Sequence, residues 1–400
     1  MVSISCVCEQ TGGPSWGSSS SSWSSSGKSG KSGSASDGGG WYGNDDDDWA
    51  GGGYSSSSSK PESEPVSAPT HPTGWKDDGW DNDGYYKADI EDIRQECAAL
   101  IEHSERELLP KILRLVFHSC VGSQCDGCIN KENSDNRGLA EPVEGIYPMV
   151  RKYSGKLSRA DVWAICAMEA ASMAVPGDAR HFPLNYIGRQ DCEDGDDYGW
   201  SPSDNDMCSN EMTNHEMLEF FAVNFGLNDP KEVAAIMGVH SIGVLHRDVS
   251  GFGNEDKENG WVENADDYVL SNRYYTTMLD NVWELEKVEN EYPVSDQYQW
   301  YFDPQDAGPI MLTSDLSLFF NFEGYIVSDM DGIDGLVMCS THIDAEFEIE
   351  GVDGTNMPLC PMAEKTKEFV ELYAEDNEQF IHDFGIAMNK IMNWGYHTYI

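Results

Sequence analysis

The chain has 400 residues and a formal net charge of −46. That length suits one large domain or two small ones, and the acidity argues against nucleic acid or an anionic membrane surface as a partner. No apolar run approaches the length that a membrane span needs, so we expect no membrane-spanning segment. The acidity favours cations, a cationic partner or a mineral surface, although solubility alone explains it equally well.

Residues 1–87 form the first distinct region. They are rich in Ser, Gly and Asp, and the segment 1–84 contains almost no Leu, Ile or Val. Such a composition buries too little apolar surface to offset the entropy of ordering the chain. We therefore predict a disordered acidic tail and linker over 1–87, followed by a folded domain over 88–396.

Helical periodicity dominates the remainder and predicts a mainly α domain. The segment 226–229 (Gly-Leu-Asn-Asp) is typical of the end of one helix and the cap of the next. The clearest strand signal alternates polar and apolar residues over 346–350. The predicted helices cover residues 90–102, 108–119, 159–173, 215–225, 230–237, 270–285 and 363–394.

Two histidines stand in apolar contexts. His118 follows Arg-Leu-Val-Phe in the segment 114–120, and His240 follows Ile-Met-Gly-Val in the segment 236–243. A lone histidine in an apolar helix is more often a core residue than a site residue, so neither histidine decides the function alone. Further motifs follow in order at 250–252 (Ser-Gly-Phe), 260–261 (Gly-Trp), 271–275 (Ser-Asn-Arg-Tyr-Tyr), 311–315 (Met-Leu-Thr-Ser-Asp), 369–374 and 384–390.

This ordered series resembles the plant-type haem peroxidases, a superfamily that includes fungal, plant and class I enzymes. The resemblance mixes class I and class II features and covers roughly residues 88–320 and 360–396. It implies a two-lobed, mainly α haem peroxidase fold, with one haem b per chain between a distal and a proximal helix. The segment 322–360 has no counterpart in the family pattern, so we interpret it as an insert.

On the distal side, the resemblance makes His118 the acid–base residue and Arg114 the cation beside it. A neutral imidazole takes a proton from peroxide and returns it to the departing oxygen, whose growing charge a guanidinium stabilises. Phe117 would pack over the haem face, where class I enzymes usually carry tryptophan. Asn136 matches the asparagine that bonds the distal histidine, and the nearby Asn133 competes for that role.

On the proximal side, the resemblance makes His240 the axial ligand of the haem iron, followed by Ser241 as a second cofactor-binding residue. Asp315 matches the buried carboxylate that bonds the far ring nitrogen of the ligand and gives the imidazole anionic character. Trp261 matches the class I tryptophan beside the proximal imidazole, where it could hold an oxidising equivalent or only contribute packing.

Departures from the family pattern concern its cation sites. The fungal and plant enzymes have an aspartate calcium ligand directly after the distal histidine, where this chain has Ser119. Asp126 is retained, but Cys128 replaces a further ligand position, and Ser271 replaces the usual proximal aspartate. Because carboxylates supply most of the attraction for calcium, we expect neither calcium site to be kept.

Markers of the reducing substrate are also missing. The arginine that ascorbate enzymes carry nine residues after the proximal histidine is Val249 here. The two glutamates of manganese oxidisers correspond to Glu107 and Lys111, so that pair is broken. The sequence therefore predicts a small or protein-bound reductant without identifying it.

Eleven cysteines favour an oxidising compartment. The plant enzymes have a disulfide at the positions of Cys120 and Cys125. Cys339 and Cys360 bracket the insert, and we predict that they form a disulfide that closes it. The spacing of Cys120, Cys125 and Cys128 also matches a plant-type iron–sulfur run, which is the competing interpretation. We expect an extracellular, secreted protein, with the cytoplasm as the alternative, because residues 1–8 do not form a convincing signal peptide.

These observations predict a haem-dependent peroxidase that reduces hydrogen peroxide and oxidises a donor by single electrons. The alternative belongs to another class of protein: a weakly active or inactive peroxidase-like acidic structural protein of an extracellular matrix, such as the mineralised matrix of an invertebrate shell. The composition of the tail, the net acidity and the altered cation positions motivate that alternative.

Overall fold

The computed structural model describes residues 82–396, except for 123–124, 178–181, 183, 185, 204–206, 254–259, 263–267, 289–296, 303–307, 328–334, 343–347, 350–351 and 354–356. The predicted tail lies outside the described residues, apart from 82–87. Those six residues belong to the first helix, so that helix begins ahead of the predicted domain boundary at residue 88.

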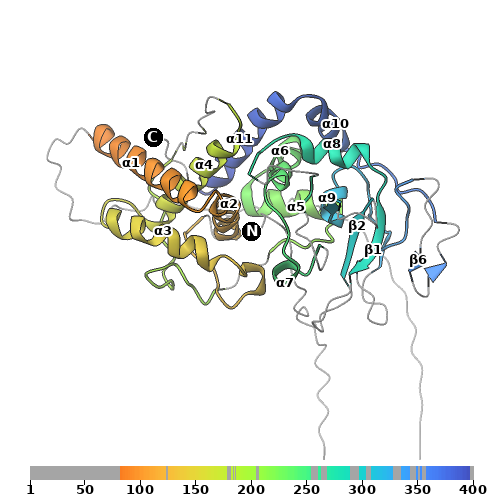
Figure 1. Cartoon of the computed structure of the whole chain (residues 1–400), viewed down its shortest axis with the longest axis horizontal. Helices are drawn as coiled ribbons and strands as arrows, with labels where there is room; N and C mark the ends of the chain where they lie inside the picture. The colour runs from red at the N-terminus through yellow and green to blue at the C-terminus, as the bar shows by residue number, and fades with distance from the viewer. Residues whose placement is uncertain are drawn as a thin grey trace, which may run out of the picture. The chain divides into compact units, whose positions relative to one another are not determined.

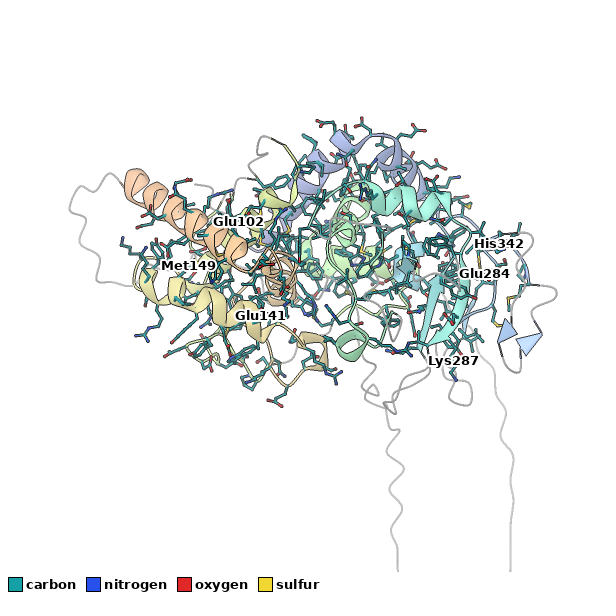
Figure 2. The ribbon with its side chains drawn as sticks, in the orientation of Figure 1. Glu102, Glu141, Met149, Glu284, Lys287 and His342 are labelled. Carbon is teal, nitrogen blue, oxygen red and sulfur yellow. A yellow bond between two sulfur atoms is a disulfide. The ribbon has the colours of Figure 1, made fainter. Side chains whose placement is uncertain are left out.

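Four helices form a first group: α1 (Asn82–His103), α2 (Leu108–Cys120), α3 (Ala140–Tyr153) and α4 (Arg159–Ala174). Helix α4 packs against α1 and α2, and α3 packs against α2 (Figure 1). Every residue of α2 is buried, so this helix runs through the core. Lys111 of α2 forms an ion pair with Glu141 of α3, which is labelled in Figure 2.

A second group contains α5 (Asn214–Phe225), α6 (Pro230–Met237), α8 (Arg273–Asp280), α10 (Lys367–Glu375) and α11 (Asn377–Asn393). Helix α11 packs against α6, and α10 packs against α8. Gly226 ends α5 with a left-handed φ of 65°, and a Cβ there would collide with Trp394. Asp229 caps α6, so the predicted stop-and-cap segment is confirmed.

The remaining helical elements are short. They are α7 (Arg247–Ser250), α9 (Thr313–Leu316) and two 3-10 turns, η1 (Ser134–Asn136) and η2 (Gly238–Ser241). Helices dominate the described part of the chain, so the predicted mainly α class is confirmed. None of the described helices combines the length and the apolar character that a membrane span requires.

Three helix predictions differ from the structure. The predicted helix 270–285 ends at Asp280, where Trp283 donates its indole N–H to the carbonyl of Met278 at 2.9 Å. The predicted helix 363–394 is two helices, because Asp376 leaves the helical conformation and caps α11. Helix α3 was not predicted, since Pro148 lies inside it and proline lacks the N–H that helices need.

An antiparallel sheet was also missed. Strand β1 (Glu284–Val288) pairs with β2 (Gln297–Tyr301), which pairs with β3 (Ile310–Met311). In β1, Leu285 is buried opposite Trp300, an alternation that fits a strand and not the end of a helix. Strand β3 leads directly into α9, so the sheet determines where α9 lies.

The insert holds two small hairpins. Strand β4 (Ile326–Val327) pairs with β5 (Leu336–Val337), and β6 (Glu348–Ile349) pairs with β7 (Val352–Asp353). Strand β6 lies within the predicted strand 346–350, whose residues 346, 347 and 350 are outside the described residues. The insert contacts the larger sheet through Thr341, whose hydroxyl donates to the carbonyl of Trp283 at 2.6 Å, and His342 is labelled beside β1 in Figure 2.

Four disulfides connect the described residues: Cys97–Cys166, Cys120–Cys125, Cys128–Cys192 and Cys339–Cys360. Two of them are the expected pairs. The other two were not predicted, because connectivity does not follow from spacing. The iron–sulfur interpretation is wrong, since Cys120, Cys125 and Cys128 are all consumed in disulfides.

The bridge between Cys339 and Cys360 should stabilise the insert. Replacing both cysteines with alanine should lower the free energy of unfolding by about 3 kcal/mol, because the bridge closes a loop of 21 residues in the unfolded chain. Urea denaturation of parent and variant measures this difference. Peptide mapping without reduction is the control, and alkylation of both parental thiols would contradict the bridge.

Candidate functional site

Helix α2 presents Arg114 and His118 on one face, one turn apart, and both are buried. The guanidinium of Arg114 holds the turn η1. Its Nη1 donates to the carbonyl of Arg137 at 2.8 Å, and its Nη2 donates to the carbonyl of Asp135. These two carbonyls lie on either side of Asn136 in the sequence, so Arg114 fixes the backbone that presents this asparagine.

Asn136 contacts His118. Its Oδ1 lies 2.8 Å from Nδ1 of His118, and its Nδ2 donates to the carbonyl of Asn130 at 2.8 Å. Because a carbonyl only accepts, the second bond turns the amide oxygen toward the histidine, and Nδ1 must carry the proton. The competing Asn133 instead caps the backbone N–H of Asp135 at 2.8 Å.

The other ring nitrogen of His118 therefore carries a lone pair. This Nε2 is buried and finds no hydrogen-bond partner among the described residues. Burial lowers the pKa of His118 well below its ordinary 6.5, and the charge of Arg114 lowers it further, while the bond to Asn136 raises it. The result is a neutral, buried imidazole whose basic nitrogen is held ready in one orientation.

His240 lies in η2, directly after α6. Its Nδ1 is 2.7 Å from Oδ1 of Asp315, and both side chains are almost fully buried. The indole of Trp261 stacks on the imidazole with ring centroids 4.4 Å apart and an interplanar angle of 23°. Since a carboxylate accepts, Nδ1 carries the proton and Nε2 of His240 keeps the lone pair that a metal needs.

Four donors converge on Asp315. Its Oδ1 accepts from His240 and from the hydroxyl of Tyr274 at 2.8 Å, and its Oδ2 accepts from Trp261 Nε1 at 2.6 Å and the N–H of Leu312 at 2.7 Å. Two carboxylate oxygens offer about four lone-pair sites, so this buried carboxylate is saturated. Burial, followed by the charge of Asp315, raises the pKa of Tyr274 well above its ordinary value.

The sheet brings these residues together. Strand β3 ends at Met311, just before Leu312 and α9, which carries Asp315. The N–H of Ile310 donates to the carbonyl of Gly260 at 3.1 Å, which holds the segment of Trp261 against β3. Tyr274 was missed as a site residue, although it belongs to the 271–275 motif that contributed to the family resemblance.

Ser241 and Ser271 contact each other directly. Ser241 is buried, and its hydroxyl oxygen accepts from the N–H of Ser271 at 3.1 Å. On the distal side, Asp126 accepts from the N–H of Cys128 at 3.1 Å, and burial raises the pKa of this carboxyl to about 6. Among the described residues, no group of three or more His, Cys, Asp or Glu side chains is arranged to hold a metal ion.

A small cavity lies between α2 and η2. Phe117 of α2 and His240 of η2 both line it, whereas His118 does not, and its walls are apolar apart from the imidazole. The ring of Phe117 also packs on Phe225, with centroids 5.1 Å apart. The full lining is Phe117, Phe221, Ile236, Met237, Val239, His240 and Met388. The cavity therefore combines apolar walls with an imidazole that could bind a metal.

Comparisons with known proteins match this geometry. A family model described as Peroxidase matches residues 93–324, which is more than half of the chain. A Debaryomyces hansenii protein named as a candidate heme-binding peroxidase is 26% identical over 253 residues, or 57% of this chain and 53% of that protein. A mitochondrial cytochrome c peroxidase of Neurospora crassa is 25% identical over 259 residues, or 65% and 52% of the two chains.

A plant protein is similar as well. Cytosolic L-ascorbate peroxidase 1 of Oryza sativa subsp. indica is 26% identical over 205 residues, or 48% of this chain and 74% of that protein. The matched part of the chain covers about half the length of the Debaryomyces hansenii and Neurospora crassa proteins. Together these matches confirm the resemblance inferred from the motifs. The two named locations, mitochondrion and cytosol, lend no support to the expected secretion.

The pKa of His118 should respond to its two neighbours in opposite directions. Arg114→Leu should raise it, because a positive charge beside the ring disfavours protonation, and Asn136→Leu should lower it further. Titration of the His118 ring protons by NMR measures both shifts, with the exposed His382 as internal reference. The matched control Arg114→Lys keeps the charge, and equal shifts in the Leu and Lys variants would contradict the electrostatic cause.

Proposed function

Because this chain belongs to the peroxidase family, a class of oxidoreductases, we propose that it reduces hydrogen peroxide at a haem b and oxidises a one-electron donor. The observation that carries this proposal is the pair of oriented imidazoles. One has a buried basic nitrogen with no hydrogen-bond partner among the described residues, and the other is bonded to a buried carboxylate and lines the apolar cavity. Unrelated core histidines would not combine these features.

The residues around the cavity fit a haem. His240 would hold the iron through Nε2, because Nδ1 is occupied by Asp315. Phe117 would cover one face of the macrocycle, and the apolar lining would exclude water from it. A bound haem supplies the redox chemistry, namely the two-electron reduction of peroxide and the return of those electrons from a donor.

His118 performs the proton transfers in this proposal. Its Nε2 would take a proton from one oxygen of hydrogen peroxide and deliver it to the other oxygen, which leaves as water. Asn136 holds the tautomer that makes this possible, since its amide oxygen keeps the proton on Nδ1. The lowered pKa keeps the ring neutral near pH 7, where it must act as a base.

Arg114 contributes a fixed positive charge near the leaving oxygen. The carbonyls of Asp135 and Arg137 hold its guanidinium, so little reorganisation is needed when negative charge develops. Proximally, Asp315 draws on the Nδ1 proton of His240 and strengthens the imidazole as a ligand. Trp261 is the nearest aromatic ring to that imidazole and is our candidate for storing an oxidising equivalent.

The donor and the compartment follow from weaker signals. The arginine typical of ascorbate oxidation is absent, and the glutamate pair typical of manganese oxidation is broken by Lys111, which is engaged with Glu141. We therefore propose a one-electron donor of another kind. Each cysteine of the described part is disulfide-bonded, which supports an oxidising compartment. The scaffold alternative rests on the composition of 1–87, and a purified protein without a haem absorbance band would support it.

Loss of the iron ligand should abolish haem binding. His240→Ala should not retain stoichiometric haem, because it removes the imidazole that lines the cavity. His118→Ala is the control and should keep haem, since its imidazole does not line the cavity. The Soret absorbance per chain measures both. Equal haem content in His240→Ala and the parent would refute His240 as the ligand.

Loss of the distal base should slow the reaction with peroxide. His118→Leu should reduce the rate of the first spectral change after mixing with hydrogen peroxide by about 10²–10⁴, the usual contribution of general acid–base catalysis. Stopped-flow absorbance measures this rate. The matched control is His103→Leu at the exposed end of α1, which should react like the parent. A parental rate in His118→Leu would refute the assignment.

A further inference from the structure

Tyr274 is the donor to Asp315 that the proposed reaction does not use. Its hydroxyl reaches Oδ1, the same oxygen that accepts from His240, whereas Trp261 bonds the opposite oxygen. All four side chains are at most 2% exposed, so water does not compete for these bonds. The hydroxyl must donate here, because every other group on the carboxylate is an N–H donor and the oxygens can only accept.

Two donors on one oxygen weaken each other. A hydrogen bond to a carboxylate stabilises its negative charge and lowers its affinity for any further proton. The bond from Tyr274 therefore reduces the pull of Oδ1 on the Nδ1 proton of His240. In a site whose side chains are this deeply buried, the competition is strong, because the effective dielectric constant is low. The donor strength of the imidazole toward a metal then depends on Tyr274.

Tyr274 also helps to hold the imidazole in place. Its ring meets the ring of His240 edge-on, with centroids 5.9 Å apart and an interplanar angle of 83°. Trp261 stacks on the same imidazole with an interplanar angle of 23°. The histidine is thus constrained by one aromatic face and one aromatic edge, and the hydroxyl of Tyr274 lies in the same hydrogen-bond network.

We propose that Tyr274 is a positioning residue that weakens the hydrogen bond between Asp315 and His240 and thereby raises the reduction potential of the metal that His240 binds. This inference deepens the proposed function, because it assumes that the metal is haem iron. It assigns to Tyr274 an effect opposite to that of Asp315. The carboxylate increases the anionic character of the ligand, and the phenol limits that increase.

The test is Tyr274→Phe, which removes one oxygen and keeps the ring. The equilibrium constant for ferric reduction should fall about tenfold, equivalent to ~59 mV for a one-electron couple. Spectroelectrochemical titration of the haem-loaded protein measures the potential. The matched control is Tyr275→Phe, whose hydroxyl is equally buried but donates to the carbonyl of Ala234 at 2.7 Å, so its potential should stay at the parental value. Equal potentials in the two variants would overturn the proposal.

A second readout needs no haem and separates this inference from the proposed function. In the metal-free protein, the Nδ1 proton of His240 should resonate further downfield in Tyr274→Phe than in the parent, because its bond to Asp315 strengthens. An unchanged resonance would overturn the proposal even if haem binds. If the parent binds no haem and the resonance still moves downfield in Tyr274→Phe, the proposed function is refuted and the role of Tyr274 stays supported.

A third variant guards against a Tyr274→Phe protein that does not fold. Difluorotyrosine placed at residue 274 alone keeps the hydroxyl and makes it a stronger donor. The reduction potential should then rise above the parental value, and the Nδ1 proton of His240 should move upfield. A shift with the sign expected for phenylalanine would overturn the proposal, because a merely structural role of the ring does not predict opposite signs for the two substitutions.

Discussion

The buried carboxylate of Asp315 is the constraint around which the proximal half of the domain is organised. A bare carboxylate in a protein interior would cost several kcal/mol, and only a full set of donors makes its burial tolerable. Those donors come from three separate places in the chain: η2, the segment of Trp261, and α8 with Tyr274. The backbone of Leu312 supplies the fourth. The carboxylate thus connects segments that are distant in sequence, and misplacing any one of them leaves a buried charge partly unsatisfied.

In the distal half, the buried titratable side chain is uncharged. His118 is buried on a helix whose every residue is buried, and its imidazole is kept neutral by burial and by Arg114. The orientation of the ring depends on one amide, and the amide depends on the carbonyl of Asn130. Asn130 follows the segment held by the Cys128–Cys192 disulfide and by the backbone bonds of Ile129 to Gly199 and Ser201. Covalent bridges therefore support the loop on which the tautomer of the histidine depends.

The guanidinium of Arg159 joins the same loop to the segment that follows Cys192. Its Nε donates to the carbonyl of Gly127 at 2.7 Å, and its Nη1 donates to the carbonyl of Asp196 at 2.8 Å. The guanidinium of Arg159 and the Cys128–Cys192 disulfide thus join two acidic loop segments.

Local patterns were enough to predict most of the helices, the pairing of Arg114 with His118 on one helical face, and the change of structure at Gly226 and Asp229. These features depend on residues within about one or two turns of each other, where spacing alone decides the geometry. The family resemblance added the expected roles of His240, Trp261 and Asp315, because the order of motifs along a chain is visible without a fold. Sequence spacing also marked Cys339 and Cys360 as the ends of the insert.

Tertiary structure decided what sequence spacing leaves open. Leu285 became a strand residue because it packs opposite Trp300, and Asn136 was distinguished from Asn133 because only its amide is oriented by Asn130. The pairing of Cys128 with Cys192 and the hydroxyl of Tyr274 on Asp315 join residues 64 and 41 positions apart. The sequence by itself determined which chemical groups are present and which of them share a helix. Which groups share one buried oxygen or one sulfur bridge depends on how distant segments pack, and no local pattern encodes that.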